Sequence, residues 1–269
     1  MKHRLFIVLL ALSTMACGCQ GTTQKRASNS QRPPKQSGVS YYTFNIVTEL
    51  PHSTSAYTQG FQYADGLFWE GTGGNGSSRL QIINPLTGEA TKSISLASKY
   101  FGEGITLLGD EIFQLTWREG KAFVYDRQTL RKLREYDYQG EGWGLTTDGK
   151  LLYMSDGSDK ITIRDPKSFN PIGELKVTLG GQRVRNINEL EWIDGEIWAN
   201  IYLTTDIIRI DPATGKVVGI IDLSELQSPA DVSYRTDVLN GIAYDPATGR
   251  IWLTGKNWNK VYEVQIIQK

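Results

Sequence analysis

The chain has 269 residues, of which 39% are hydrophobic and 22% are charged, so it is long enough for one large domain with a substantial core. Its 29 basic and 29 acidic side chains leave a formal net charge of zero at pH 7. Because it has neither a basic stripe nor a long block of like charge, nucleic-acid binding is not expected.

The first segment has the order of an export signal. Residues 1–4 are basic, residues 5–12 are apolar, and small residues lead to a cysteine. The apolar run is too short to span a bilayer as a helix. The cysteine at the expected cleavage point resembles a bacterial lipoprotein signal, which predicts a signal peptide at residues 1–16 and lipidation of Cys17 or Cys19. An ordinary signal peptide is the alternative, because the usual leucine three positions before the cysteine is missing.

A polar segment follows at residues 17–40, with Pro33 and Pro34 inside it. This composition predicts a flexible tether. The protein is therefore expected to be exported, with its body in the periplasm, anchored by lipid to a bacterial membrane. Both cysteines and His3 precede the body, which keeps one histidine, His52. A Ser-His-Asp site, a Cys-His site and a zinc site of His and Cys ligands are thus not expected there.

Residues 41–50 alternate in polarity and predict a strand. From residue 57 onward one pattern then recurs: a polar or aromatic residue, usually a glycine, a few mainly apolar residues and a turn. The successive leading positions are 44, 40, 45 and 52 residues apart, a period typical of propellers and related repeats. These positions are Gln59, Glu103, Trp143, Asn188 and Asn240.

Each repeat is predicted to form four short strands, most clearly the fourth. Its strands are expected at residues 186–193, 196–202, 207–210 and 217–223, with the turn sequence DPATG before the last one. The fifth repeat supplies three strands, at residues 241–244, 250–253 and 260–267. We expect the strand at 41–50 to pair beside the last of them and to close the ring without an open edge.

An all-β sandwich is the alternative, because its strands also recur every 8 to 12 residues. A sandwich does not explain the longer period. The sequence therefore favours a five-bladed β-propeller over residues 41–269, closed by the N-terminal strand.

In a small propeller the innermost strands surround a central channel, so the leading positions should share one pocket near its mouth. Glu103 stands between two glycines beside apolar residues, where partial burial would raise its pKa toward a value useful for proton transfer. Taken alone, Trp143 fits a core position, Asp156 a turn and Asn240 a residue that satisfies backbone groups. The second strands of the repeats end in residues expected at the rim: Trp117, Asp156, Tyr202 and Lys256.

Several short segments resemble the glutamine cyclotransferase family of the plant-latex type. They include YTQGF at 57–61, YFGEGIT at 100–106, EGWGL at 141–145 and TGK at 254–256. The resemblance runs in order from residue 57 to the C-terminus. It implies a five-bladed propeller that converts N-terminal glutamine to pyroglutamate with loss of ammonia.

The resemblance also implies roles for individual residues. Glu103 is expected to be the acid/base, with Gln59, Asn188 and Lys256 holding the substrate. Either Lys256 or Gln59 would stabilise the oxyanion. The residues expected to line or border the pocket are Phe101, Trp117, Trp143, Tyr202 and Asn240.

Tyr57, Phe61 and Tyr202 depart from the usual family pattern, which bears on pocket shape. No cofactor is expected to be required, and a chelator-insensitive enzyme is predicted. A structural cation in the channel, held by Glu189 or Asn240, is left open. The expected partners are peptides or proteins with N-terminal glutamine.

Two other functions are alternatives to the cyclase. A non-catalytic exported propeller would bind a peptide or cell-wall fragment at the channel mouth through its aromatic residues. A calcium-dependent hydrolase of the lactonase kind would need several converging carboxylates, whereas the leading positions offer only Glu103.

Overall fold

The computed structural model describes residues 38–269, and the predicted signal peptide, both candidate lipidation cysteines and the tether up to residue 37 lie outside the described residues. The described part is all-β, as predicted, with 22 strands and one short 3-10 helix, η1 (Pro229–Asp231). Within it, no helix has the length and apolar character that crossing a membrane requires.

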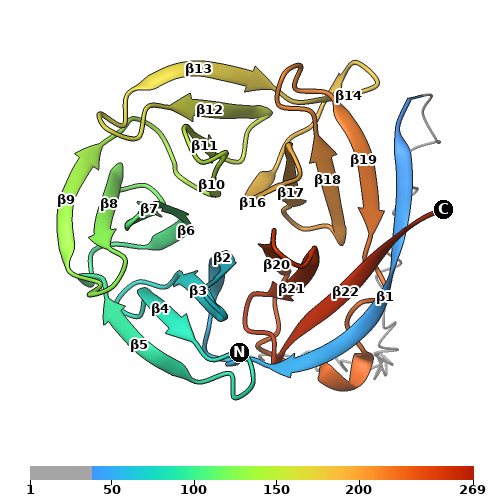
Figure 1. The fold of residues 1–269 in the computed structure, drawn as a ribbon, viewed down its shortest axis with the longest axis horizontal. Coiled ribbons are helices and arrows are strands. Elements are labelled where there is room, and N and C mark those ends of the chain that lie inside the picture. The colour runs from blue at the N-terminus through green and yellow to red at the C-terminus, as the bar shows by residue number, and fades with distance from the viewer. Residues whose placement is uncertain (1–37) are drawn as a thin grey trace, which may run out of the picture. The chain divides into compact units, whose positions relative to one another are not determined.

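Three antiparallel sheets of four strands follow one another along the chain, each in sequence order (Figure 1). The first holds β2 (Thr58–Ala64), β3 (Leu67–Thr72), β4 (Arg79–Ile83) and β5 (Ala90–Ser95). The second holds β6 (Gly102–Leu108), β7 (Glu111–Thr116), β8 (Lys121–Asp126) and β9 (Lys132–Asp137). The third holds β10 (Leu145–Thr147), β11 (Leu152–Ser155), β12 (Lys160–Arg164) and β13 (Pro171–Lys176).

The remaining long strands form one eight-stranded sheet in the order β16-β17-β18-β19-β1-β22-β21-β20. A two-stranded hairpin, β14 (Thr178–Leu179) and β15 (Gln182–Arg183), lies between β13 and β16 in the chain. The strands of the large sheet are β1 (Ser40–Pro51), β16 (Ile187–Ile193), β17 (Glu196–Ile201), β18 (Asp206–Ile210), β19 (Val217–Asp222), β20 (Leu239–Asp245), β21 (Arg250–Gly255) and β22 (Lys260–Gln268).

The N-terminal strand β1 pairs antiparallel with β22 from Tyr42 to Pro51, which confirms the predicted pairing of the first and last strands. A second pairing was not predicted. The start of β1 also runs parallel to β19, where Ser40 lies opposite Gly219 and Tyr42 opposite Ile221. Only the N-terminal end of β1 takes part in the parallel pairing. The antiparallel pairing with β22 ends at the same place, with Tyr42 opposite Gln268.

Five strands lie toward a common centre (Figure 1): the first strands of the three four-stranded sheets, β2, β6 and β10, and the two end strands of the eight-stranded sheet, β16 and β20. Neighbouring inner strands approach very closely. A Cβ atom at Gly144 would lie 2.0 Å from the carbonyl oxygen of Asn188, and one at Gly60 would lie 2.3 Å from the amide nitrogen of Ile105. Glycine is therefore needed where these strands meet, because any side chain would collide with backbone.

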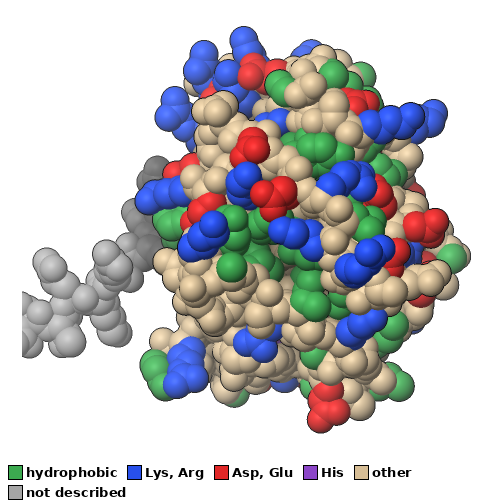
Figure 2. Space-filling model, turned by 90° about the vertical axis from the view of Figure 1, so that its left-hand side faces the viewer, with side chains coloured by type: hydrophobic (Ala, Val, Ile, Leu, Met, Phe, Trp, Pro, Cys, Tyr) green, Lys and Arg blue, Asp and Glu red, His purple; other side chains and the backbone are tan. Residues whose placement is uncertain are grey.

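Apolar side chains fill the spaces between adjacent sheets. Phe113 and Leu115 of the second sheet, for example, are buried with Leu145 and Leu152 of the third. The predicted DPATG turns are stabilised by hydrogen bonds within the turn itself. In one of them, Asp211 accepts the Ala213 N–H at 3.0 Å and the Thr214 hydroxyl at 2.6 Å. On the outside, Figure 2 shows basic and acidic side chains interspersed, without a large field of one sign on that face.

Candidate active site

A cavity of about 230 Å³ opens where the inner strands begin and the second strands end. Phe101 precedes β6, Trp117 follows β7, Tyr202 follows β17 and Lys256 follows β21. These places share one edge of the sheets because the first two strands of each group are antiparallel. The cavity is lined by Tyr57, Gln59, Phe101, Glu103, Trp117, Trp143, Asn188, Tyr202 and Lys256.

Eight of the nine lining residues were predicted for the site from sequence, and the structure brings them together. For the ninth, Tyr57, the sequence indicated only a departure from the family pattern that bears on pocket shape. Asn240 was predicted there but does not line the cavity. Asp156 does not line it either: its Oδ1 accepts the Ser158 N–H at 2.9 Å, as expected of a turn residue.

Glu103 is buried on β6, with 4% of its surface exposed. Burial raises the pKa of its carboxyl group well above the usual value; the nearby Lys256 ammonium opposes this shift, and the charges of Glu141 and Glu119 add to it. The register between β6 and β7 shifts between Gly102 and Ile105, so Glu103 sits in a bulge. A bulge re-aims a side chain, which explains how a strand residue reaches the cavity.

Gln59 occupies the matching bulge of β2 and connects two other leading positions. Its Nε2 donates to Glu103 Oε1 at 3.0 Å. Its Oε1 accepts from Asn240 Nδ2 at 3.3 Å, and the same Asn240 nitrogen donates to the Thr58 carbonyl at 2.9 Å. Asn240 is fully buried behind Gln59, so it orients that amide instead of lining the cavity.

Lys256 lies between two tyrosines. Its Nζ is 4.8 Å from the centre of the Tyr57 ring and 5.1 Å from that of Tyr202, which is cation–π geometry. Burial lowers the pKa of the lysine, while the charges of Glu103 and Asp237 oppose that change. None of the described residues forms a hydrogen bond or an ion pair with this ammonium group.

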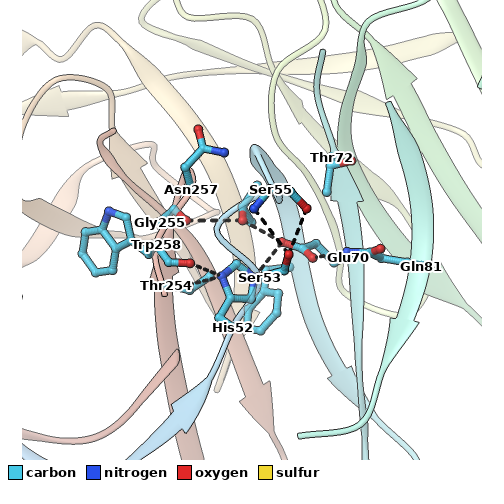
Figure 3. A network of polar contacts seen from close by, with 12 residues as sticks. His52, Ser53, Ser55, Glu70, Thr72, Gln81, Thr254, Gly255, Asn257 and Trp258 are labelled. Atoms are coloured by element: carbon cyan, nitrogen blue, oxygen red, sulfur yellow. Dashed lines mark hydrogen bonds and ion pairs between the residues drawn. The ribbon is translucent and has the colours of Figure 1, made fainter. Parts of the chain in front are cut away.

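A buried polar network lies just beyond Gln59, in the loop after β1 and the neighbouring strands (Figure 3). His52 Nε2 lies 3.0 Å from Glu70 Oε1, and His52 Nδ1 lies 2.9 Å from the Trp258 carbonyl oxygen. Glu70 also accepts the Thr58 hydroxyl at 2.6 Å and Gln81 Nε2 at 2.7 Å. The network joins the first sheet to the last two strands of the chain, directly beside a cavity residue.

Glu189 is a second buried carboxyl group on an inner strand, and it is bonded to the backbone. It is buried on β16, and its two oxygens accept the backbone N–H groups of Phe61 at 3.2 Å and Ile242 at 3.0 Å. Burial raises the pKa of this carboxyl group well above its usual value, and the charge of Glu191 adds to the shift. Residues 38–269 contain no group of three His, Cys, Asp or Glu side chains arranged to hold a metal ion.

A glutamine cyclotransferase family model matches residues 11–266. The chain belongs to the glutamine cyclotransferase family. One member, a glutaminyl-peptide cyclotransferase of Arabidopsis thaliana, is 40% identical over 228 residues, which cover 83% of this chain and 71% of the relative. The crystal structure of the Myxococcus xanthus glutaminyl cyclase matches with a TM-score of 0.81 and 37% identity, over 86% of this chain and 99% of that one.

Proposed function

We propose that the protein is a glutaminyl-peptide cyclotransferase that converts the N-terminal glutamine of peptides or proteins to pyroglutamate and releases ammonia. The observation that carries this proposal is a buried carboxyl group, Glu103, in an aromatic-walled cavity beside the ammonium group of Lys256. The family and the named activities of its two relatives support the same reaction.

The reaction begins when the neutral α-amine of the substrate attacks the carbonyl carbon of its own side-chain amide. A carbon–nitrogen bond forms and closes a five-membered ring through a tetrahedral intermediate, and the original amide bond then breaks. Glu103 takes a proton from the attacking nitrogen and returns it to the departing one, so that ammonia leaves. Because the step is intramolecular, holding the side chain in a folded conformation supplies much of the rate.

The oxygen of the intermediate becomes negative, and we assign its stabilisation to Lys256. The ammonium group has no hydrogen-bond partner among residues 38–269, whereas the Gln59 amide is bonded at both ends. Preorganised donors of this kind typically supply about 3 to 4 kcal/mol in the transition state. Gln59 then serves mainly to hold the Glu103 carboxyl group in place.

The remaining lining residues bind the substrate. Asn188 is 2% exposed, and we assign its side-chain amide to the substrate backbone. Phe101, Trp117 and Trp143 surround the glutamine methylene groups and exclude water, and Tyr202 completes the wall.

We also propose that the protein is a propeller of five blades. Counting β16–β19 and β20–β22 plus β1 as separate groups divides the eight-stranded sheet into two blades, for a total of five. The antiparallel pairing of β1 with β22 supports closure of the last blade by the N-terminal strand. For residues 1–37 we propose a lipoprotein signal and a tether that hold the enzyme at a membrane in the periplasm. The tether ends earlier than the predicted residue 40, because Val39 packs against the core and Ser40 begins β1.

The proposed chemistry uses no metal, so EDTA should leave turnover unchanged. For the structural cation considered in the channel, Glu189 is the candidate carboxylate, although both its oxygens already accept backbone N–H groups. If chelation abolished turnover and added calcium restored it, the metal-free mechanism would be wrong and the reaction would depend on a bound cation.

The decisive experiment incubates the purified protein with a peptide that begins with glutamine, beside a Glu103→Gln variant. Ammonia release and a mass loss of about 17 Da, the mass of the ammonia that the ring closure expels, report the reaction; the variant should lose about 10²–10⁴-fold in kcat while still binding the peptide. No turnover by the wild-type protein on several such peptides, with binding retained, would favour the non-catalytic propeller.

A further inference from the structure

Five aromatic side chains line the cavity, and their rings meet in two groups. Tyr57 contacts Phe101 at a centroid distance of 6.2 Å, and Phe101 contacts Trp117 at 5.6 Å. Trp143 contacts Tyr202 at 5.7 Å. Among the described residues, the rings of Trp117 and Trp143 make no direct ring contact, so the two groups are not joined through their tryptophan rings.

Glu141 connects the two groups through hydrogen bonds. Trp117 Nε1 donates to Glu141 Oε2 at 2.8 Å, and Trp143 Nε1 donates to the same oxygen at 2.9 Å. Arg118 Nε donates to the other oxygen, Oε1, at 3.0 Å. An indole has a single N–H donor, so this one carboxylate receives the entire hydrogen-bonding capacity of both rings.

Glu141 is ionised, as an acceptor of two indole N–H groups should be. Burial by itself would raise its pKa, but the hydrogen bonds from Trp143, Trp117 and Arg118 outweigh that effect and lower the pKa. The guanidinium group of Arg118 also lies over the Trp117 ring, 3.7 Å from its centre. The carboxyl group is therefore ionised near neutral pH, when it acts as an acceptor only.

We propose that Glu141 is a positioning residue, which fixes the orientations of Trp117 and Trp143 and thereby the shape of the cavity in which glutamine folds back on itself. Glu141 does not line the cavity, so it acts through the two rings. This inference rests on the proposed cyclase function. It matters for that reaction because a misplacement of about 1 Å can cost roughly 10²-fold in rate.

A second effect of Glu141 must be separated from positioning. Its negative charge helps to raise the pKa of Glu103, and so does the charge of Glu119. Glu119 has no hydrogen bond to either tryptophan; its carboxylate accepts the backbone N–H of Phe101 at 3.4 Å. Glu119→Gln is therefore a matched control for the loss of one neighbouring charge.

The experiment compares the wild-type protein with Glu141→Gln, Glu141→Asp and Glu119→Gln. Glu141→Asp keeps the charge but shortens the side chain, so it tests reach without removing the field at Glu103. For each protein, kcat and KM for a glutamine-initiated peptide are measured, together with the near-UV circular dichroism of the substrate-free protein.

Both Glu141 variants should lose about 10- to 100-fold in kcat/KM and should show a changed tryptophan spectrum. Glu119→Gln should keep the wild-type spectrum and change kcat/KM less than about threefold at the pH optimum. If either Glu141 variant folds and matches Glu119→Gln in both readouts, positioning is excluded. The spectra are recorded without substrate, so absence of wild-type turnover would refute the cyclase function separately.

Discussion

Gln59 and Glu103, 44 residues apart on neighbouring sheets, meet through one hydrogen bond from the side-chain amide to Glu103 Oε1 at 3.0 Å. Because Asn240 holds the other end of the amide, Gln59 is fixed before any substrate arrives. The Lys256 ammonium group has no hydrogen-bond partner among residues 38–269. This difference separates two residues that the sequence left equivalent as candidates for oxyanion stabilisation.

Replacing Lys256 with methionine should lower kcat by about 10²–10³-fold, because the cation nearest the developing oxyanion is lost. Gln59→Ala should cost less, since it removes a group that holds Glu103. Steady-state kinetics on a glutamine-initiated peptide would test this order, with Lys121→Met on β8 as the surface control. A larger loss in Gln59→Ala than in Lys256→Met would reverse the assignment.

The acid limb of the kcat/KM profile, which reports the substrate-free enzyme, should lie well above pH 4.5, the usual carboxyl value, because the pKa of Glu103 is raised. Ionised Glu103 is the base, so kcat/KM should rise with pH through that raised pKa. The charge of Glu119 contributes to the shift; removing it in Glu119→Gln should therefore move the limb to lower pH. A limb that stays in place would argue against Glu103 as the titrating group.

The buried pair of His52 and Glu70 should make stability depend on pH. Burial by itself would lower the pKa of His52, but the Glu70 carboxylate and the hydrogen bonds of His52 raise it above 6.5. Burial by itself would raise the pKa of Glu70, but His52 and the other hydrogen-bond donors of Glu70 lower it below 4.5. The histidine contribution is full below pH 6.5 and disappears as pH rises through the raised value. The glutamate contribution is full above pH 4.5 and disappears as pH falls through the lowered value.

His52→Gln should therefore cost most between pH 4.5 and 6.5, by about 3–5 kcal/mol, because the Glu70 charge then remains buried without its partner. Urea unfolding of both proteins at pH 5.5 and pH 9 would measure this. A stability difference that does not shrink at the higher pH would show that the pair is not charged. The double variant with Glu70→Gln should recover part of the loss.

Gly144→Ala should destabilise the fold by about 1–3 kcal/mol or more, since the new Cβ would lie 2.0 Å from the Asn188 carbonyl oxygen and its three nearest atoms all belong to the backbone. Turnover should fall as well, because Asn188 lines the cavity. Gly173→Ala is the matched control: its Cβ would be 3.4 Å from the end of the Ile163 side chain. Equal free energies of unfolding for the two variants would contradict a close-packed centre.

Much of the fold could be predicted because its signals are local. The strands expected at 217–223 and 260–267, for example, are found as Val217–Asp222 and Lys260–Gln268. Side-chain alternation and the turn preferences of Asp, Pro and Gly act over a few residues, so they can be recognised in a single sequence. The repeat register predicted seven of the nine cavity residues, and the family resemblance added Phe101.

The tertiary structure alone decided how those residues are used. The bulges that aim Gln59 and Glu103 depend on neighbouring strands, and the bond from Asn240 to Gln59 spans 181 residues. Glu141 gained its two tryptophan donors in the same way, from residues brought together when the sheets pack. The sequence by itself determined the repeat, the strands and the chemistry available at their ends, because these follow from local backbone preferences. Three features depend on contacts that exist only once the sheets have packed together. These are the amide that supports Glu103, the cation that has no hydrogen-bond partner among residues 38–269, and the carboxylate that binds the tryptophans.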